Sequence, residues 1–303
     1  MAGLWSGAPG SRISPAMFKA AVPALALLGA SPLAASLPPA AIVFDPTPDP
    51  AAPASMKAFV LPSHGSGLNA VFYKASGAGP HPTLLLLHGF PGNEQNLDLA
   101  QAARRAGWHV LTLHYRGSWG SRGDFSFHHC AEDAQAALAW LRAQGAAGGI
   151  ATSRIVVAGH SMGGMMAAFA AARDPDVMGT VLIDPWDIAA TGRSFADPAA
   201  KKEFIEGELR GDLPPLAGTS EAALVTEIET AGADLDLAET AKNIGKRPLL
   251  VIGAERALAP TARTVAAAAG PAARLVVMPT DHSFSDHRIA LANALLGFLQ
   301  DRR

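Results

Sequence analysis

The stretch Gly159-His160-Ser161-Met162-Gly163 decides how the rest of the sequence is interpreted. A short apolar run, Ile155-Val156-Val157-Ala158, precedes it and predicts a strand, while the Met- and Ala-rich segment after it predicts a helix. A serine flanked by glycines between a strand and a helix is typical of a nucleophile elbow. The turn is so tight that side chains two residues before and after the serine would collide. We therefore expect Ser161 to be a catalytic nucleophile.

Composition excludes several other kinds of protein. The chain has 303 residues, of which 49% are hydrophobic and 17% charged, and this fits one large globular domain. A net charge of −2 without a long basic run argues against nucleic acid as the main partner. Cys130 is the only cysteine, so an internal disulfide is impossible and a cysteine-based structural zinc site nearly so.

Residues 1–36 have the pattern of a signal peptide. Lys19 precedes an apolar run over residues 20–28, and Ala34-Ala35-Ser36 offers a cleavage site. The pattern predicts export to the periplasm or the medium. It matches a signal peptide better when residues 1–16 are left out, so Met17 is a candidate for the true start. A disordered extension of a cytoplasmic protein is the alternative. The run is too short and too rich in alanine to span a membrane, so we expect no stable membrane anchor.

The remaining chain predicts an α/β domain over residues 56–303. Residues 37–55 are rich in Pro and Ala and predict a linker without regular structure. A hairpin is expected next, and strand-like runs then alternate with helical patterns, which predicts a mostly parallel sheet flanked by helices. About eight strands are expected, at 58–61, 68–73, 83–87, 109–113, 155–158, 180–183, 248–252 and 274–278. The clearest helical patterns lie at 96–106, 132–142 and 286–300.

One connection is much longer than a single crossover helix requires. About sixty residues separate Ile183 from Pro248. Helical patterns at 199–209 and 220–230 predict a helical cap over about 188–246, inserted between the sixth and seventh strands. A peripheral decoration is the alternative, but this connection leaves the sheet beside the elbow, which favours a cap over the carboxyl ends of the strands.

A serine nucleophile needs a general base, and position selects it among ten histidines. His282 follows the last predicted strand and therefore lies on a loop at the carboxyl edge of the sheet, where catalytic groups gather in open α/β folds. His287 is the alternative, but it falls inside the final predicted helix, with Ser285 or Asp286 as the N-cap. We therefore predict His282 as the base.

The serine also needs donors for the oxyanion that forms during acyl transfer. The stretch His88-Gly89-Phe90-Pro91-Gly92 ends the strand before the first long helix, and its turn can present the backbone N–H of Phe90. Pro91 has no N–H to offer. The second expected donor is the backbone N–H of Met162.

Together these residues resemble the α/β-hydrolase fold serine hydrolases, and most closely the branch of dienelactone hydrolases and prolyl oligopeptidases. The resemblance covers about residues 56–303. It implies acyl transfer to Ser161 and then hydrolysis, with a small carboxylic ester as the expected substrate and neither a metal nor an organic cofactor. The matching stretches, in the family's order, are His88-Gly89-Phe90-Pro91-Gly92, Tyr115-Arg116-Gly117, Gly159-His160-Ser161-Met162-Gly163 and Asp281-His282.

The acid of the expected triad departs from the family pattern. The family usually places an Asp three residues after the glycine that ends the seventh strand, and this chain has Arg256 there. Glu255 lies one residue earlier, and Asp184 closes the sixth strand, a position that some relatives use. We prefer Glu255 and keep Asp184 as the alternative. A third alternative is that no acid operates.

Other residues have competing interpretations. His128-His129-Cys130, with Glu132 and Asp133, suggests a metal site, but adjacent histidines rarely point at one ion, so we expect these residues to begin a helix. Cys130 is expected to be inert.

Three further residues are candidates for the substrate pocket: His88, Trp119 and Trp186. Phe125 has the same status, and a surface loop is the alternative for Trp119 and Phe125. The same machinery can also cleave amides, peptides or lactones, and the irregular acid leaves a non-catalytic binding protein as a further alternative.

Overall fold

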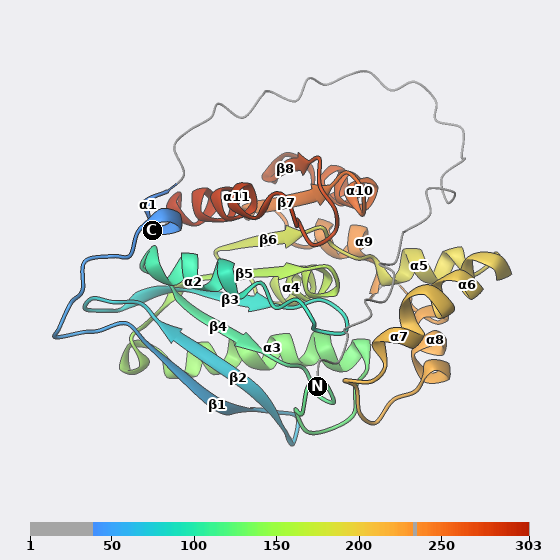
Figure 1. The fold of residues 1–303 in the computed structure, drawn as a ribbon, viewed down its shortest axis with the longest axis horizontal. Helices are drawn as coiled ribbons and strands as arrows, with labels where there is room; N and C mark the ends of the chain where they lie inside the picture. Colours follow the sequence, from blue (N-terminus) through green and yellow to red (C-terminus); the bar gives the residue numbers. More distant parts are fainter. Residues whose placement is uncertain (1–38, 233–234, 303) are drawn as a thin grey trace, which may run out of the picture. The chain divides into compact units, whose positions relative to one another are not determined.

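The computed structural model describes residues 39–232 and 235–302 (Figure 1). Its strands form one sheet in the order β1-β2-β4-β3-β5-β6-β7-β8, in which β1, β2 and β4 pair antiparallel and the other neighbours pair parallel. The predicted eight-stranded, mostly parallel sheet is therefore confirmed. The strands are β1 (Ser55–Ser63), β2 (Ser66–Lys74), β3 (His81–Leu87), β4 (His109–Leu113), β5 (Ile150–His160), β6 (Gly179–Ile183), β7 (Leu249–Ala254) and β8 (Ala273–Met278). The predicted signal peptide lies outside the described residues, so export stays a prediction.

Both faces of the sheet are covered by helices. Leu84 and Leu86 of β3 are buried on one face together with α2 and α11, while Leu85 and Leu87 are buried on the other with α3, α4, α9 and α10. Among the described residues, none of the helices has the length and hydropathy needed to cross a bilayer. These helices are α2 (Leu97–Arg105), α3 (Phe127–Gln144), α4 (Met162–Arg173), α9 (Leu237–Lys242), α10 (Ala259–Ala269) and α11 (Arg288–Gln300).

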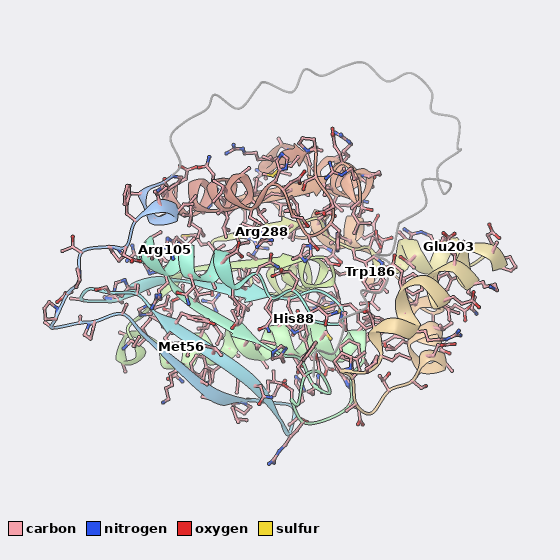
Figure 2. The ribbon with its side chains drawn as sticks, viewed as in Figure 1. Met56, His88, Arg105, Trp186, Glu203 and Arg288 are labelled. Carbon is pink, nitrogen blue, oxygen red and sulfur yellow. The ribbon has the colours of Figure 1, made fainter. Side chains whose placement is uncertain are left out.

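The segment predicted as an unstructured linker contains a short helix, α1 (Ala40–Val43). Its Ala41 and Ile42 pack against the apolar layer that contains α2 and α11. The Arg105 side chain of α2 donates from Nε to the carbonyl oxygen of Ala41 at 2.6 Å (Figure 2). The prediction failed at these residues because an apolar pair was available to cover the edge of the core.

The cap is present, but it is smaller than predicted. Its helices are α5 (Ile188–Ser194), α6 (Pro198–Phe204), α7 (Arg210–Asp212) and α8 (Glu221–Glu229), and a π-helical turn joins α6 to α7. Figure 1 shows them gathered at the end of the sheet to which the arrowheads of β3, β5 and β6 point. Helix α9 instead buries Leu237 and Ala241 in the same apolar layer as α4 and α10. It therefore belongs to the layer over the sheet.

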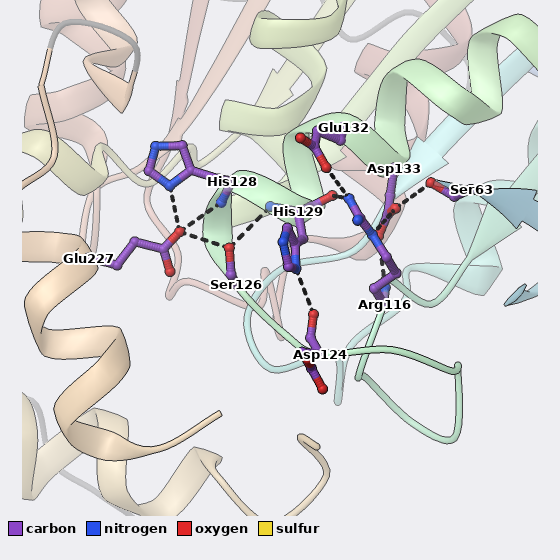
Figure 3. A network of polar contacts seen from close by, with 9 residues as sticks. All are labelled: Ser63, Arg116, Asp124, Ser126, His128, His129, Glu132, Asp133 and Glu227. Carbon is purple, nitrogen blue, oxygen red and sulfur yellow. Dashed lines mark hydrogen bonds and ion pairs between the residues drawn. The ribbon is translucent and has the colours of Figure 1, made fainter. Parts of the chain in front are cut away.

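A buried ion pair joins the β4–α3 connection to the β1–β2 hairpin (Figure 3). Arg116 donates from Nε and from its backbone N–H to the carboxylate of Asp133, both at 2.7 Å. Ser63, at the end of β1, donates to the same carboxylate at 2.6 Å. Asp133 is fully buried and Arg116 nearly so. Because every charge in this contact has a partner, the pair is tolerated inside the protein.

Removing the Asp133 carboxylate leaves the Nε–H and the backbone N–H of buried Arg116 without their acceptor, although the guanidinium keeps its ion pair with Glu132. We expect Asp133→Ala to lower the free energy of unfolding by about 3–5 kcal/mol. Urea unfolding followed by circular dichroism measures this. Glu221→Ala is the matched control, because it breaks the Arg210–Glu221 pair on the surface of the cap and should leave stability nearly unchanged. Equal stability of Asp133→Ala and wild type would contradict this account.

Candidate active site

The serine of the elbow has the strained backbone that the glycines predicted. Ser161 lies between β5 and α4 with φ 56° and ψ −123°, a conformation that residues with a Cβ rarely adopt. A Cβ on Gly159 would lie 1.9 Å from the carbonyl oxygen of Gly163, and a Cβ on Gly163 would lie 2.3 Å from that of Leu87. Glycine is therefore required at both positions, and the structure provides the sharp turn that the sequence indicated.

His282 lies beside the elbow, on the loop between β8 and α11. Its carbonyl oxygen accepts a hydrogen bond from Nε2 of His160 at 2.8 Å, and the centroids of the two rings are 4.5 Å apart. The residue before Ser161 therefore holds the backbone of the histidine loop. His160 is buried, and burial lowers its pKa to about 3, so its ring is neutral.

Asp184 is the partner of His282. Its Oδ2 lies 2.6 Å from Nδ1 of His282. The aspartate follows β6 with φ 40° and is fully buried. Its carboxylate also accepts hydrogen bonds from the backbone N–H of Ala254 at 2.8 Å and of Leu258 at 3.3 Å. An ionised carboxylate only accepts, so Nδ1 of His282 carries the proton and the lone pair of a neutral ring is on Nε2.

The preference for Glu255 as this partner is wrong. The Glu255 side chain is exposed, and its backbone N–H donates to the carbonyl oxygen of Met278 at 2.9 Å. Arg256, in the usual position of the acid, donates to the carbonyl oxygen of Pro279 at 2.7 Å. The turn after β7 thus supplies N–H donors to Asp184 and no carboxylate to His282.

The loop after β3 lies against the serine. A Cβ on Gly89 would lie 2.9 Å from Cβ of Ser161. Nδ1 of His88 donates to the carbonyl oxygen of Gly89 at 2.7 Å. The Gly89–Phe90 peptide is trans, so the N–H of Phe90 points away from His88. Met162 is the first residue of α4, where a backbone N–H has no partner within its own helix.

Two of the predicted pocket residues have other positions. His88 is only 2% exposed, and its ring packs against His114 and Tyr115 (Figure 2). Burial lowers its pKa to about 4, so it is neutral at pH 7. Trp119 is 42% exposed and donates from Nε1 to the carbonyl oxygen of Pro91 at 3.0 Å. Both residues brace the loop after β3, and Phe125 is buried as well. Only Trp186 remains a pocket candidate.

Arg288 holds the residue directly after His282. Its guanidinium donates to the carbonyl oxygen of Ser283 at 3.1 Å and to the side chain of Asn96 at 3.0 Å (Figure 2). His287 is the N-cap of α11, so the predicted caps Ser285 and Asp286 were wrong. The His287 ring contacts Asp286 at 3.0 Å. Because α11 begins two residues later than expected, the loop that carries His282 is longer.

The residues considered for a metal site instead begin α3 and fasten the cap (Figure 3). Ser126 caps α3, which begins at Phe127, five residues before the predicted start. Glu227 of α8 accepts hydrogen bonds from the backbone N–H of Phe127 at 3.1 Å and of His128 at 2.8 Å, and it contacts Nδ1 of His128 at 2.6 Å. A carboxylate at the positive end of a helix is stabilising. His129 contacts the carbonyl oxygen of Asp124 at 2.8 Å. No local pattern in the sequence indicates this role of Glu227.

The family model described as the alpha/beta hydrolase family matches residues 84–294 of the chain. The sequence has no match among curated proteins.

Several solved structures have a similar fold. The carboxylesterase EstE1, cloned from a metagenomic library, is 23% identical with a TM-score of 0.62, and the alignment covers 87% of this chain and 92% of that one. The enol-lactonase from Burkholderia xenovorans LB400 is 19% identical with a TM-score of 0.59, covering 80% and 100%. The acylaminoacyl peptidase of Pyrococcus horikoshii is 16% identical with a TM-score of 0.58, covering 82% and 42%. At these identities the likeness concerns the fold.

The position of Asp184 leads to a first test of the site. We expect Asp184→Asn to lower kcat for an activated ester strongly, on the scale of the roughly 10⁴-fold loss known for the acid of serine protease triads. Glu255→Gln is the matched control and should keep wild-type turnover, since its side chain is exposed. Turnover of p-nitrophenyl acetate measures both variants. Equal activity of Asp184→Asn and wild type would contradict the assignment.

The neutral buried histidines predict that acid destabilises the fold. In the unfolded chain each takes up a proton near pH 6.5, while in the native state His88 and His160 stay neutral down to about pH 4 and about 3. Protons therefore bind preferentially to the unfolded state, and stability falls as the pH drops below about 7. At pH 5 we expect a loss of about 2 kcal/mol for each histidine.

Urea unfolding at pH 7.5 and pH 5 measures this loss. His160→Gln removes one of the histidines whose pKa is lowered by burial, so the difference in stability between the two pH values should shrink. His64→Asn, at the exposed β1–β2 turn, is the control and should leave the difference unchanged. A fold that is equally stable at both pH values would refute the prediction.

Proposed function

Because the chain belongs to the alpha/beta hydrolase family, we propose that it is a serine hydrolase that cleaves a carboxylic ester. The observation that carries this proposal is the 2.6 Å contact between Oδ2 of Asp184 and Nδ1 of His282. The backbone carbonyl of His282 also accepts a hydrogen bond from His160, the residue before Ser161. This arrangement supports the order of groups that activates a serine: a buried acid, an oriented imidazole and a nucleophile on a strained turn.

The proposed reaction begins with attack of Oγ of Ser161 on the ester carbonyl carbon. Nε2 of His282 takes the hydroxyl proton, and Asp184 stabilises the imidazolium that results. When the carbon–oxygen bond of the ester breaks, the imidazolium gives its proton to the leaving alcohol. Water then attacks the acyl-enzyme with the same proton transfers, which releases the acid and restores Ser161.

The oxyanion is proposed to bind between the backbone N–H groups of Phe90 and Met162. His88 holds the Gly89 carbonyl and thereby the orientation of the peptide that carries the Phe90 donor. Burial lowers the pKa of His88 to about 4, so its ring is neutral at pH 7 and carries its proton on Nδ1, the nitrogen that contacts the Gly89 carbonyl. Fixed donors of this kind need no reorganisation as the charge develops.

A carboxylic ester is the first substrate to test. The names of two structural neighbours, a carboxylesterase and an enol-lactonase, describe enzymes of open-chain and cyclic esters. The peptidase neighbour is matched over only 42% of its chain, so its activity is the weaker guide.

A fluorophosphonate probe tests the nucleophile directly. We expect covalent labelling of the folded protein at Ser161 and turnover of p-nitrophenyl acetate, both lost in Ser161→Ala. Ser194→Ala, at an exposed serine of the cap, is the control and should behave like wild type. Folded wild-type protein that is neither labelled nor active would refute the proposal and leave a binding protein as the better interpretation.

A further inference from the structure

Aromatic side chains gather beside the serine. The sequence is only 6% aromatic, yet rings from the loop after β3, the start of α3, the segment after β6 and cap helix α6 contact one another with centroids 5.4–6.3 Å apart. The members of this aromatic cluster are Phe90, Phe125, Phe127, Trp186, Phe195 and Phe204.

Burial divides the cluster into two groups. Phe125 and Phe127 are almost completely buried, Phe195 is 7% exposed, and all three belong to the apolar core. Phe90, Trp186 and Phe204 are only half-buried and pack against this core from outside. The second group therefore keeps part of its ring surface accessible.

Trp186 is fixed next to the nucleophile. Its backbone N–H donates to the carbonyl oxygen of Ser161 at 3.1 Å. Its indole Nε1 donates to the hydroxyl of Thr191 on α5 at 2.7 Å, so rotation of the ring would break this bond. Figure 2 shows Trp186 between the ends of the strands and the cap helices. The orientation of the indole is thus set before substrate binds.

Phe204 extends this aromatic surface from the cap. It is the last residue of α6, and its ring stacks on that of Trp186 with centroids 5.9 Å apart and planes 30° apart. On another side of Trp186 lies the ring of Phe90, with its centroid 6.3 Å away. Phe90 follows Gly89, which touches Ser161. The half-buried rings thus lead from the cap to the serine.

Such a surface favours a flat ring over a puckered one of similar size. Aromatic pairs in stacked or edge-to-face contact gain about 0.5–1.5 kcal/mol beyond the burial of area, a factor of about two to ten in affinity. A saturated six-membered ring buries a similar apolar area but lacks the quadrupole and the flat faces.

We propose that Phe204 is a specificity-determining residue which, with Trp186, gives the site a preference for esters that carry an aromatic ring near the scissile bond. This inference rests on the proposed ester hydrolysis. The ring belongs to the acid or to the alcohol part of the substrate, and the two cases are separated by the substrates chosen below.

Two matched pairs of esters test the preference. Methyl phenylacetate and methyl cyclohexylacetate differ only in the ring of the acid part, and benzyl acetate and cyclohexylmethyl acetate only in the ring of the alcohol part. Within each pair a saturated carbon separates the ring from the ester, which limits the difference in intrinsic reactivity. We expect the aromatic member of one pair to have a kcat/KM about two- to tenfold higher.

Variants connect this preference to the ring of Phe204. Phe204→Leu should bring the ratio close to one, while Phe204→Tyr should keep it. Phe59→Leu is the matched control, because Phe59 is also half-buried and stacked on a tryptophan, Trp140 of α3, at 4.7 Å. Phe59 belongs to β1, and its loss should leave the ratio unchanged.

The outcomes distinguish this inference from the proposed function. A wild-type ratio near one in both pairs, or an unchanged ratio in folded Phe204→Leu, overturns the aromatic preference while ester hydrolysis stands. Turnover of p-nitrophenyl acetate without turnover of either aromatic ester does the same. A chain that hydrolyses no ester and is not labelled at Ser161 overturns both.

Discussion

The buried carboxylate of Asp184 is the contact on which the arrangement of the site depends. A charge inside a protein is costly unless donors surround it. Here the donors come from Nδ1 of His282 and from the backbone N–H groups of Ala254 and Leu258. One carboxylate thereby joins the end of β6, the turn after β7 and the loop after β8. If it were absent, these three segments would lose the group that sets their spacing.

The parallel sheet makes this convergence possible. The carboxyl ends of β5, β6 and β7 lie side by side, so Ser161 and Asp184 follow neighbouring strands. The backbone N–H of Ser161 donates to the carbonyl oxygen of Ile183 at 2.9 Å, which fixes the elbow to β6 directly before the acid. His282 needs a loop to reach the same edge, and His160 and Arg288 bind two consecutive carbonyl oxygens of that loop, those of His282 and Ser283. The chemistry of the site is therefore carried by loops whose positions are set by a rigid sheet.

The sequence predicted what local sterics and periodicity determine. The strand positions follow from apolar runs, as Leu84 to Leu87 illustrate by filling both core layers in alternation. Glycine is needed on both sides of Ser161 because neighbouring backbone atoms leave no room for a Cβ at these positions. The carboxylate that contacts His282 did not follow, because Asp184 and Glu255 come directly after neighbouring strands, β6 and β7. Only the path of the turn after β7 decides which carboxylate reaches His282.

Other failures have the same physical origin. The contact of Glu227 with the start of α3 joins residues about a hundred positions apart, and no local pattern of either segment indicates it. The sequence predicted His88 as a residue of the substrate pocket. Its ring instead points toward the loop after β3, where Nδ1 donates to the carbonyl oxygen of Gly89. Side-chain direction at a loop depends on the packing around it, which periodicity does not describe.

The cap and the sheet edge contribute different residues to the site. The cap is anchored at two places on the connection between β4 and α3, by Glu227 at the start of the helix and by a bridge between Ser118 and Leu216. Asp184, His282 and Ser161 all lie outside the cap helices, at the carboxyl ends of the strands and on the loop after β8. Helix α6 contributes the ring of Phe204, which stacks on Trp186. Trp186 lies two residues after Asp184 in the chain. Changes within the cap can therefore alter the aromatic surface beside Trp186 while the hydrogen bonds around His282 remain intact.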